Sequence, residues 1–331
     1  MRLPNWLGDT VMALPMLRAL GVAAPQAELW CLGPWATTLL ESEPGVARRL
    51  DLPASGPARR RFHQELRQAG LDLALLTTNS FGTALEAWRT RARWRIGFAG
   101  DGRSGLLTHA VPSPVPSPHQ VAAYLGLLAP LGLVPPPVPP RLAVAPGRRG
   151  QARRLIAELP TGSGPVVGIQ LGAAFGPSKL WPADRLAALA GGLAADGTRV
   201  VFLGTPAAST LLREVSGYLG QAPASLVGRD EPALLPALLA ELTVLVSPDS
   251  GPAHVAAAVG VPTVTLFGPT HPGLTAPLGS HATSVWHPPA CAPCFQPRCP
   301  IDHRCLGAIQ VDEVVAAVRA ALALAARGPS G

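Results

Sequence analysis

The chain has 331 residues, and at roughly 150 residues per domain this length favours two domains. Hydrophobic residues make up 48% of the chain and charged residues 14%, which excludes a mainly disordered protein. No apolar run approaches the roughly 18 residues of a membrane span, and Asp9 interrupts the stretch where a secretory signal would be apolar. A cytoplasmic protein is therefore expected.

Nearly all the basic residues are arginines. Of the 27 lysines and arginines only Lys179 is a lysine, and the formal net charge is +7. Arginines cluster at 48–49, 59–61 and 89–95. A solvated surface is the plain interpretation, and attraction to an anionic glycolipid at the inner face of a membrane is the alternative. With 5% aromatic residues and no nucleic-acid motif, no nucleic-acid partner is expected.

Short apolar runs alternate with amphipathic stretches before residue 134. They predict strands at 29–33, 71–77 and 95–99, and helices at 10–23, 59–69 and 120–131. The loop 4–9 should follow a buried strand, yet only three residues precede it. We therefore expect a truncated first strand, a gap in the middle of the first sheet, and a native start upstream of Met1.

A Pro-rich segment at 134–140 divides the chain, because no helix or central strand can hold its five prolines. Beyond it the alternation resumes. The predicted strands are 166–171, 199–203, 244–247 and 261–267, and the predicted helices are 149–159, 182–195, 207–219, 232–240, 252–259 and 311–326.

Strands that are apolar on both faces and alternate with helices indicate parallel sheets covered on both sides. The predicted fold is α/β, with two doubly wound, Rossmann-like domains facing each other across a ligand cleft. The first domain spans residues 1–146 and includes the linker 134–146. The second spans 147–310, and the helix 311–327 is expected to pack back across the cleft.

The most informative motif is the run Pro248-Asp249-Ser250-Gly251-Pro252-Ala253-His254, between a predicted strand and a helix. Ser250 or Gly251 suits the cap and Pro252 the first helical position. Free N–H groups at such a helix start favour a phosphate, and His254 in the first turn could donate to the same anion. The simpler interpretation, in which these residues only cap and pack, stays open.

The only lysine lies in the loop 172–181, after another predicted strand and before another helix. A compact ammonium there suits a leaving diphosphate, whose negative charge it would follow as it develops. A surface lysine is the alternative. The chain has no GxxxxGK[ST] and no GxGxxG motif, so a P-loop kinase or an ordinary dinucleotide dehydrogenase has little support.

Asp9 falls at the start of the first predicted helix. Capping is its structural interpretation, and a general base is its functional one; position alone does not decide between them.

Four cysteines, Cys291, Cys294, Cys299 and Cys305, lie within fifteen residues. A cytosolic setting argues against stable disulfides, and four thiols suit structural zinc or an iron–sulfur cluster, although the spacing matches no standard finger. Cys31 stands alone and is expected in the core.

Three segments, 4–14, 172–181 and 248–269, together resemble glycosyltransferase family 9, the bacterial ADP-heptose:lipopolysaccharide heptosyltransferases, most closely the heptosyltransferase II type. The resemblance implies the GT-B architecture. It implies that the C-terminal domain binds ADP-heptose and that the N-terminal domain binds an anionic, lipid-linked saccharide (the lipid A–core acceptor) at the inner membrane surface. It also implies an inverting transfer by a cytoplasmic protein that is peripheral to the inner membrane. We expect this protein to be a monomer.

By the same resemblance, Asp9 matches the family's proposed catalytic base and Lys179 the lysine that steadies the diphosphate. Asp249, Ser250, Gly251 and His254 match the nucleotide-binding turn, and no metal or other cofactor is required for catalysis. The chain departs from the family at 173–174, where two alanines replace a frequent hydroxyl residue, and at 205–209, where an acidic residue is not evident.

The sequence also fits alternative functions. Within the family, another nucleotide sugar or another envelope glycan would fit. From different classes come a non-catalytic metal-binding protein built on the loop 291–305 and, more weakly, a nucleotide-sugar epimerase.

Overall fold

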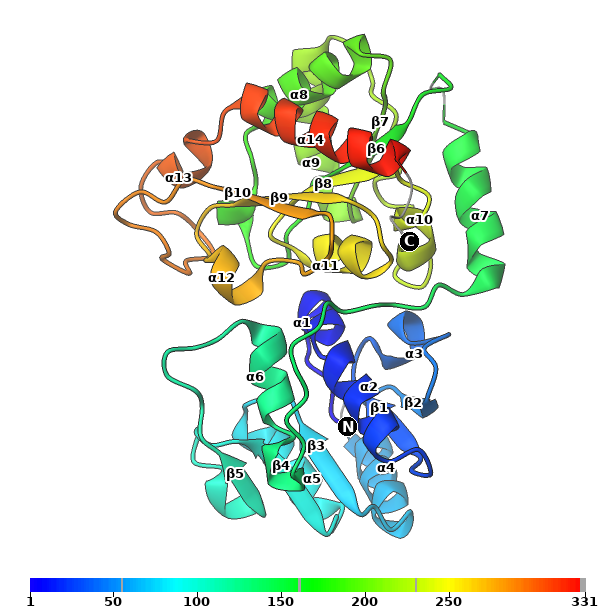
Figure 1. Cartoon of the computed structure of the whole chain (residues 1–331), viewed down its shortest axis with the longest axis vertical. Coiled ribbons are helices and arrows are strands. Elements are labelled where there is room, and N and C mark those ends of the chain that lie inside the picture. The colour runs from blue at the N-terminus through cyan, green and yellow to red at the C-terminus, as the bar shows by residue number, and fades with distance from the viewer. Residues whose placement is uncertain (55, 160–161, 230, 328–331) are drawn as a thin grey trace. The chain divides into compact units, whose positions relative to one another are not determined.

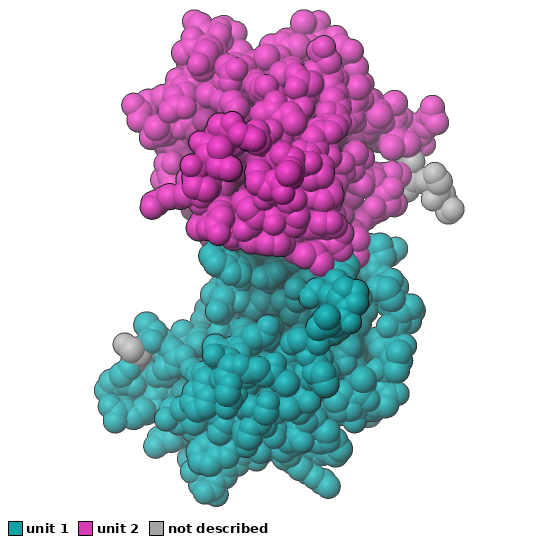
Figure 2. All heavy atoms as spheres, turned by 90° about the vertical axis from the view of Figure 1, so that its left-hand side faces the viewer, with its two compact units in different colours: residues 1–143 teal, residues 144–331 magenta. Residues whose placement is uncertain are grey.

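The computed structural model describes residues 1–54, 56–159, 162–229 and 231–327. The chain divides into two compact units, Met1–Ala143 and Val144–Gly331, which Figure 2 shows in different colours. The division lies three residues before the boundary we predicted. The Pro-rich segment 134–140 contains neither helix nor strand, as its composition predicted.

Unit 1 is a parallel α/β unit (Figure 1). Its helices are α1 Leu7–Met12, α2 Leu14–Ala23, α3 Ala36–Leu39, α4 Gly56–Gln68, α5 Phe81–Arg89 and α6 Gln120–Gly126. Its strands are β1 Leu29–Leu32, β2 Val46–Leu50, β3 Leu73–Leu76, β4 Trp94–Phe98 and β5 His109–Val111.

The predicted gap in the first sheet is wrong. Arg2 forms parallel bridges to both Leu32 of β1 and Leu76 of β3, and so joins the pair β1–β2 to the trio β3–β4–β5. Its N–H donates to the Leu75 carbonyl at 2.8 Å, and the Leu3 N–H donates to the Leu32 carbonyl at 2.8 Å. Two residues with extended backbone are enough to occupy a central position, because the neighbours supply partners on both sides. The resulting order is the 3-2-1-4-5-6 arrangement of doubly wound sheets.

Unit 2 is also a parallel α/β unit. Its helices are α7 Pro146–Ala157, α8 Ala183–Ala195, α9 Ser209–Leu219, α10 Leu235–Leu239, α11 Gly251–Ala258, α12 Pro272–Thr275, α13 Arg304–Gly307 and α14 Val311–Ala326. Its strands are β6 Val166–Gln170, β7 Arg199–Leu203, β8 Val244–Pro248, β9 Thr263–Phe267 and β10 Ala282–Trp286, in the spatial order β10-β9-β8-β6-β7.

The three central strands of unit 2, β6, β8 and β9, are buried at every residue, as expected of a parallel sheet covered on both faces. The direction of the chain reverses across the sheet between β6 and β8. In doubly wound folds the loops that leave two such strands at their carboxyl ends form the usual ligand site.

The C-terminal helix α14 packs on α8, β8 and β9 of unit 2, and Figure 1 shows it in red across that sheet. Val314 and Val318 are fully buried in one cluster with Ile169 of β6 and Val246 of β8. The apolar face of α14 is thus part of the unit 2 core. No helix in the described parts of the chain is both long enough and apolar enough to cross a membrane.

Candidate functional site

Two neighbouring strands of unit 2 end at the same edge of the sheet, and the segment after each carries a predicted site residue. Lys179 closes a short 3₁₀ helix, Pro177–Lys179, in the loop after β6. Asp249 follows β8, the strand paired with β6. The sheet therefore brings together two residues that lie 70 positions apart in the chain.

Lys179 is a buried cation, only 8% exposed. Its ammonium nitrogen lies 2.5 Å from Oδ2 of Asp249 and 3.0 Å from the Asp249 carbonyl oxygen, and 4.7 Å from the centre of the Phe175 ring. A buried charge of this kind persists only when it is paired and hydrogen-bonded. An ammonium has three N–H donors, and Asp249 accepts two of them, which leaves one for a ligand oxygen.

Thr270 completes this cluster from a third loop, the one that follows β9. Its hydroxyl donates to Oδ2 of Asp249 at 2.7 Å, and the residue is 6% exposed. The Asp249 carboxylate is thus engaged by both Lys179 and Thr270, which suits it to hold the lysine rather than to meet a phosphate of its own sign. Sequence reasoning missed Thr270, because only the pairing of β8 with β9 places it beside Asp249.

The start of α11 lies immediately after Asp249. Ser250 is the N-cap, yet its side chain makes no capping hydrogen bond and instead pairs with the Ser247 hydroxyl at 2.9 Å. The helix begins at Gly251, one residue earlier than we predicted, so Pro252 is its second residue and not its first. No side chain caps the start of α11, which is the arrangement that attracts phosphate. Within its first turn Pro252 has no N–H, and the Ala253 N–H donates to the Ser250 carbonyl at 3.1 Å. His254, fourth in the helix, is 5% exposed.

Asp9 belongs to unit 1 and is the third residue of α1, where it is partly exposed. The N-cap is Trp6, and no side chain caps the helix, so Asp9 does not play the capping role that its position suggested. The preceding loop is held at Asn5, which accepts from Arg2 Nη2 at 2.7 Å and, through its carbonyl, from Trp35 Nε1 at 2.9 Å.

A buried tyrosine of α6 lies close to Asp9. Burial, and secondly the negative charge of Asp9, raise the pKa of the Tyr124 phenol above its ordinary value. Tyr124 therefore stays a neutral phenol, whose hydroxyl is hydrogen-bonded with the Gln120 side chain. Sequence reasoning gave no signal for this residue, because the contact depends on how α6 packs on α1.

The four clustered cysteines line one small pocket, with Ser178 and Pro269 in its wall. In the described ranges no three His, Cys, Asp or Glu side chains gather into a group that could hold a metal ion. The thiols differ in character: backbone N–H groups, first that of Ile301, lower the pKa of Cys299, whereas burial raises the pKa of Cys305. Cys31 is fully buried, as predicted.

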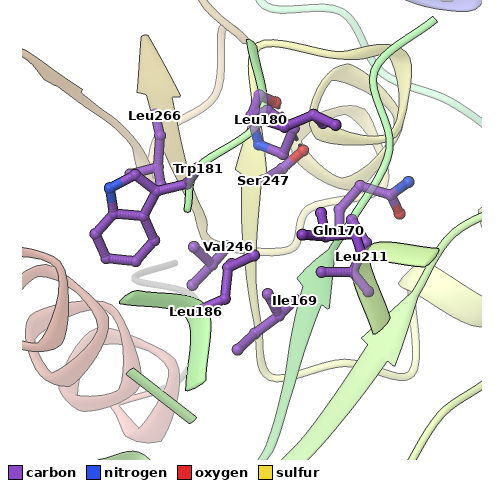
Figure 3. Close-up of a pocket in the computed structure, with 11 residues that line it drawn as sticks. Ile169, Gln170, Leu180, Trp181, Leu186, Leu211, Val246, Ser247 and Leu266 are labelled. Atoms are coloured by element: carbon purple, nitrogen blue, oxygen red, sulfur yellow. Dashed lines mark hydrogen bonds between the residues drawn. The ribbon is translucent and has the colours of Figure 1, made fainter. Parts of the chain in front are cut away.

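A small apolar pocket lies beneath the loop that carries Lys179. Figure 3 shows the aliphatic side chains of Ile169, Leu186 and Val246 in it, with Ser247 nearer the loop. This lining packs the base of the loop and offers few polar groups, so the polar cluster above it is the better candidate for binding a charged ligand.

Comparison with known proteins agrees with this geometry. The pattern of glycosyltransferase family 9 (heptosyltransferase) matches residues 59–304. The lipopolysaccharide heptosyltransferase 2 of Salmonella typhimurium is 32% identical over 301 residues, which cover 85% of each chain. The lipooligosaccharide heptosyltransferase 2 of Haemophilus influenzae is 28% identical and covers 85% of this chain and 86% of its own.

Among solved structures, the E. coli ADP-heptose LPS heptosyltransferase II matches with a TM-score of 0.83 and 28% identity, over 98% of each chain. This similarity confirms the predicted α/β class, with two Rossmann-like parallel-sheet units of the GT-B type. The match to the family pattern extends over well more than half of the sequence. The chain therefore belongs to glycosyltransferase family 9, the heptosyltransferases, and is a glycosyltransferase.

Proposed function

We propose that this enzyme transfers a heptose from ADP-heptose to the inner core of lipopolysaccharide, with inversion at the anomeric carbon. The observation that carries the proposal is the buried Lys179–Asp249–Thr270 cluster beside the uncapped start of α11, at the edge where doubly wound sheets bind ligands. The relatives named as heptosyltransferase 2 support heptose as the sugar and lipopolysaccharide as the acceptor.

In the proposed reaction the donor diphosphate lies at the first turn of α11, where backbone N–H groups and the helix dipole favour negative charge. The remaining N–H of Lys179 donates to the same diphosphate. As the bond from the anomeric carbon to the phosphate oxygen breaks, negative charge grows on the departing ADP. A positive group that is already oriented stabilises that charge without reorganising, which is the effect expected of a lysine held by Asp249 and Thr270.

Asp9 acts in this proposal as the general base. Its carboxylate takes the proton from an acceptor hydroxyl while that oxygen attacks the anomeric carbon from the side opposite the leaving ADP. The products are the glycosylated acceptor, ADP and a protonated Asp9 carboxyl, which returns its proton to water.

We propose that the transfer step uses no bound metal, because Lys179 and the start of α11 supply the positive charge that a cation would otherwise bring. EDTA treatment should leave the rate of transfer unchanged. Loss of activity that one added metal restores would contradict this part of the proposal.

For the acceptor we propose approach from an anionic membrane surface through α4. Arg60, Arg61 and Arg67 are exposed on this helix, and such a basic face attracts phosphorylated glycolipids at the inner leaflet. The protein would thus act as a peripheral, cytoplasmic enzyme.

A donor screen tests the central proposal. Purified enzyme is offered ADP-heptose, UDP-sugars and GDP-sugars with a heptose-deficient lipopolysaccharide core, and products are identified by mass. We expect a single added heptose from ADP-heptose alone. Transfer only from another nucleotide sugar would assign the same site to a different donor, and no transfer with any donor would overturn the proposal.

A further inference from the structure

The segment 291–305, which we call the cysteine segment, contacts both loops that carry the donor cluster. The Ser178 hydroxyl donates to the Gln296 carbonyl at 2.6 Å, and the Ser178 N–H donates to the Pro297 carbonyl at 3.2 Å. On the other side, the N–H groups of Cys294 and Phe295 donate to the Pro269 carbonyl at 3.1 and 2.9 Å.

Each anchoring residue directly precedes a member of the donor cluster. Ser178 precedes Lys179, and Pro269 precedes Thr270; both Lys179 and Thr270 bind the Asp249 carboxylate. The cysteine segment therefore contacts two loops whose side chains, Lys179 and Thr270, must both reach the same carboxylate of Asp249. Ser178 is 2% exposed, so water does not compete for its hydrogen bonds.

The fit between the segment and these loops is close. Gly176 has a φ of 147°, and a Cβ built on it would lie 2.3 Å from the Pro297 carbonyl oxygen. A Cβ on Gly268 would lie 3.3 Å from Sγ of Cys305, the last residue of the segment, and 2.8 Å from Cγ of the residue that follows it, Leu306. Backbone contact this tight transmits a displacement of the segment to both loops, because packed interiors yield little.

The thiols lie in the same wall as these contacts. The pocket that the four cysteines line includes Ser178 and Pro269, the two anchoring residues. Within the segment, Cys299 Sγ accepts from the His303 N–H at 3.3 Å, which ties the two ends of its last turn. The sulfur-rich core of the segment thus supports the face that holds the donor loops.

We propose that the cysteine segment is a positioning element of the donor site and that Ser178 is the residue through which it sets Lys179 against Asp249. This inference rests on the proposed function, in which Lys179 meets the donor diphosphate. It assigns to the segment a role in diphosphate recognition, while the nucleoside end of the donor is bound independently of Ser178.

The test compares ADP with AMP by titration calorimetry on the full chain. Ser178→Ala should weaken ADP binding by about tenfold, the value of one shielded hydrogen bond, and leave AMP binding unchanged. Ser178→Thr keeps the hydroxyl and should restore ADP affinity. Ser216→Ala is the matched control, because it removes a serine hydroxyl that donates at 2.8 Å to a carbonyl within α9, away from the donor loops.

Gly176→Ala gives a second, larger perturbation of the same contact. The added Cβ should weaken ADP binding by more than Ser178→Ala does, again with AMP unaffected. Gly191→Ala in α8, where an added Cβ meets nothing within 4 Å, is the control for adding a methyl group.

Three results would contradict either the positioning role of Ser178 or the proposed function. Unchanged ADP affinity in Ser178→Ala overturns the positioning role, and so does an equal loss of ADP and AMP affinity, which would mean a general structural defect. Failure of the unmodified enzyme to bind ADP at all would instead overturn the proposed function.

Discussion

Asp9 and Lys179 occupy equivalent places in the two units. Each follows the first strand of its sheet: Asp9 comes after the bridge at Arg2, and Lys179 comes after β6. Lys179 is buried in an ion pair, whereas Asp9 is partly exposed on the first turn of α1. The same position in the same kind of sheet thus carries a fixed charge in one unit and an accessible charge in the other.

This difference matches what each unit has to recognise in the proposed reaction. A diphosphate is small and has the same shape in every donor. A cation that is already oriented at the ends of β6 and β8 can therefore bind it without rearrangement. An acceptor saccharide is large and must bring one hydroxyl to a base, which requires that the base be reachable. Lys179 can be buried because Asp249 balances its charge and accepts its hydrogen bonds. Thr270 in turn donates a hydrogen bond to the Asp249 carboxylate.

The variant Asp9→Asn is the strongest test of the role that this comparison gives to the accessible carboxylate of unit 1. Loss of a general base should lower kcat by about 10²- to 10⁴-fold. ADP affinity, measured by calorimetry, should be unchanged, because the proposed donor site lies in unit 2. Asp51→Asn, which alters another acidic side chain of unit 1 that pairs with Thr37, serves as the control. Turnover close to that of the unmodified enzyme would remove Asp9 from the mechanism.

Lys179→Ala should have the next largest effect. Removing one preorganised charge-stabilising group should lower kcat by about 10²- to 10³-fold. It also leaves Asp249 buried without its partner, which should cost about 3–5 kcal/mol in the free energy of unfolding. Adding Asp249→Asn should recover much of that stability in urea denaturation without recovering activity.

Lys179→Arg separates charge from shape at the same position. The 2.5 Å contact with Asp249 leaves little room for a planar guanidinium, so we expect impaired transfer even though the positive charge is kept. Full activity of this variant in the transfer assay would disprove the argument that a compact ammonium is needed.

Thr270→Val tests whether the carboxylate has to be held. The substitution removes a 2.7 Å hydrogen bond to a buried charged group, worth about 1.5–3 kcal/mol. We expect kcat/KM for the donor to fall by about tenfold or more, with Thr270→Ser close to the unmodified enzyme. Equal kinetics for the valine and serine variants would show that Asp249 positions Lys179 without Thr270.

The smallest effects should come from the exposed arginines of α4. Arg60→Gln and Arg61→Gln should each weaken binding to anionic lipid vesicles by about 1 kcal/mol, and the loss should shrink as salt is added. ADP affinity should not change. Arg213→Gln on α9 of unit 2 is the matched control. If all three variants lost the same vesicle affinity, net charge rather than the face of α4 would be responsible.

Most of the fold could be predicted from local pattern. Apolar runs located β6, β7, β8 and β9 closely, and α14 was predicted with the observed bounds. Three strands escaped prediction. β2 carries adjacent arginines, β5 is three residues long with none of them buried, and β10 has an exposed, polar centre. All three lie at sheet edges, where one side is open and the apolar signal is weak.

The amino-acid sequence alone determined the alternation of strands and helices, the Pro-rich break, and which residues were chemically suited to a diphosphate. Those features depend on neighbours in the chain, and a periodic pattern records them directly. Tertiary structure decided the rest. The engagement of Asp249 by Lys179 and Thr270, the completion of the first sheet by Arg2, and the anchoring of Ser178 by the cysteine segment join residues that are distant in sequence. Such contacts follow from the order and register of strands, which no local pattern encodes.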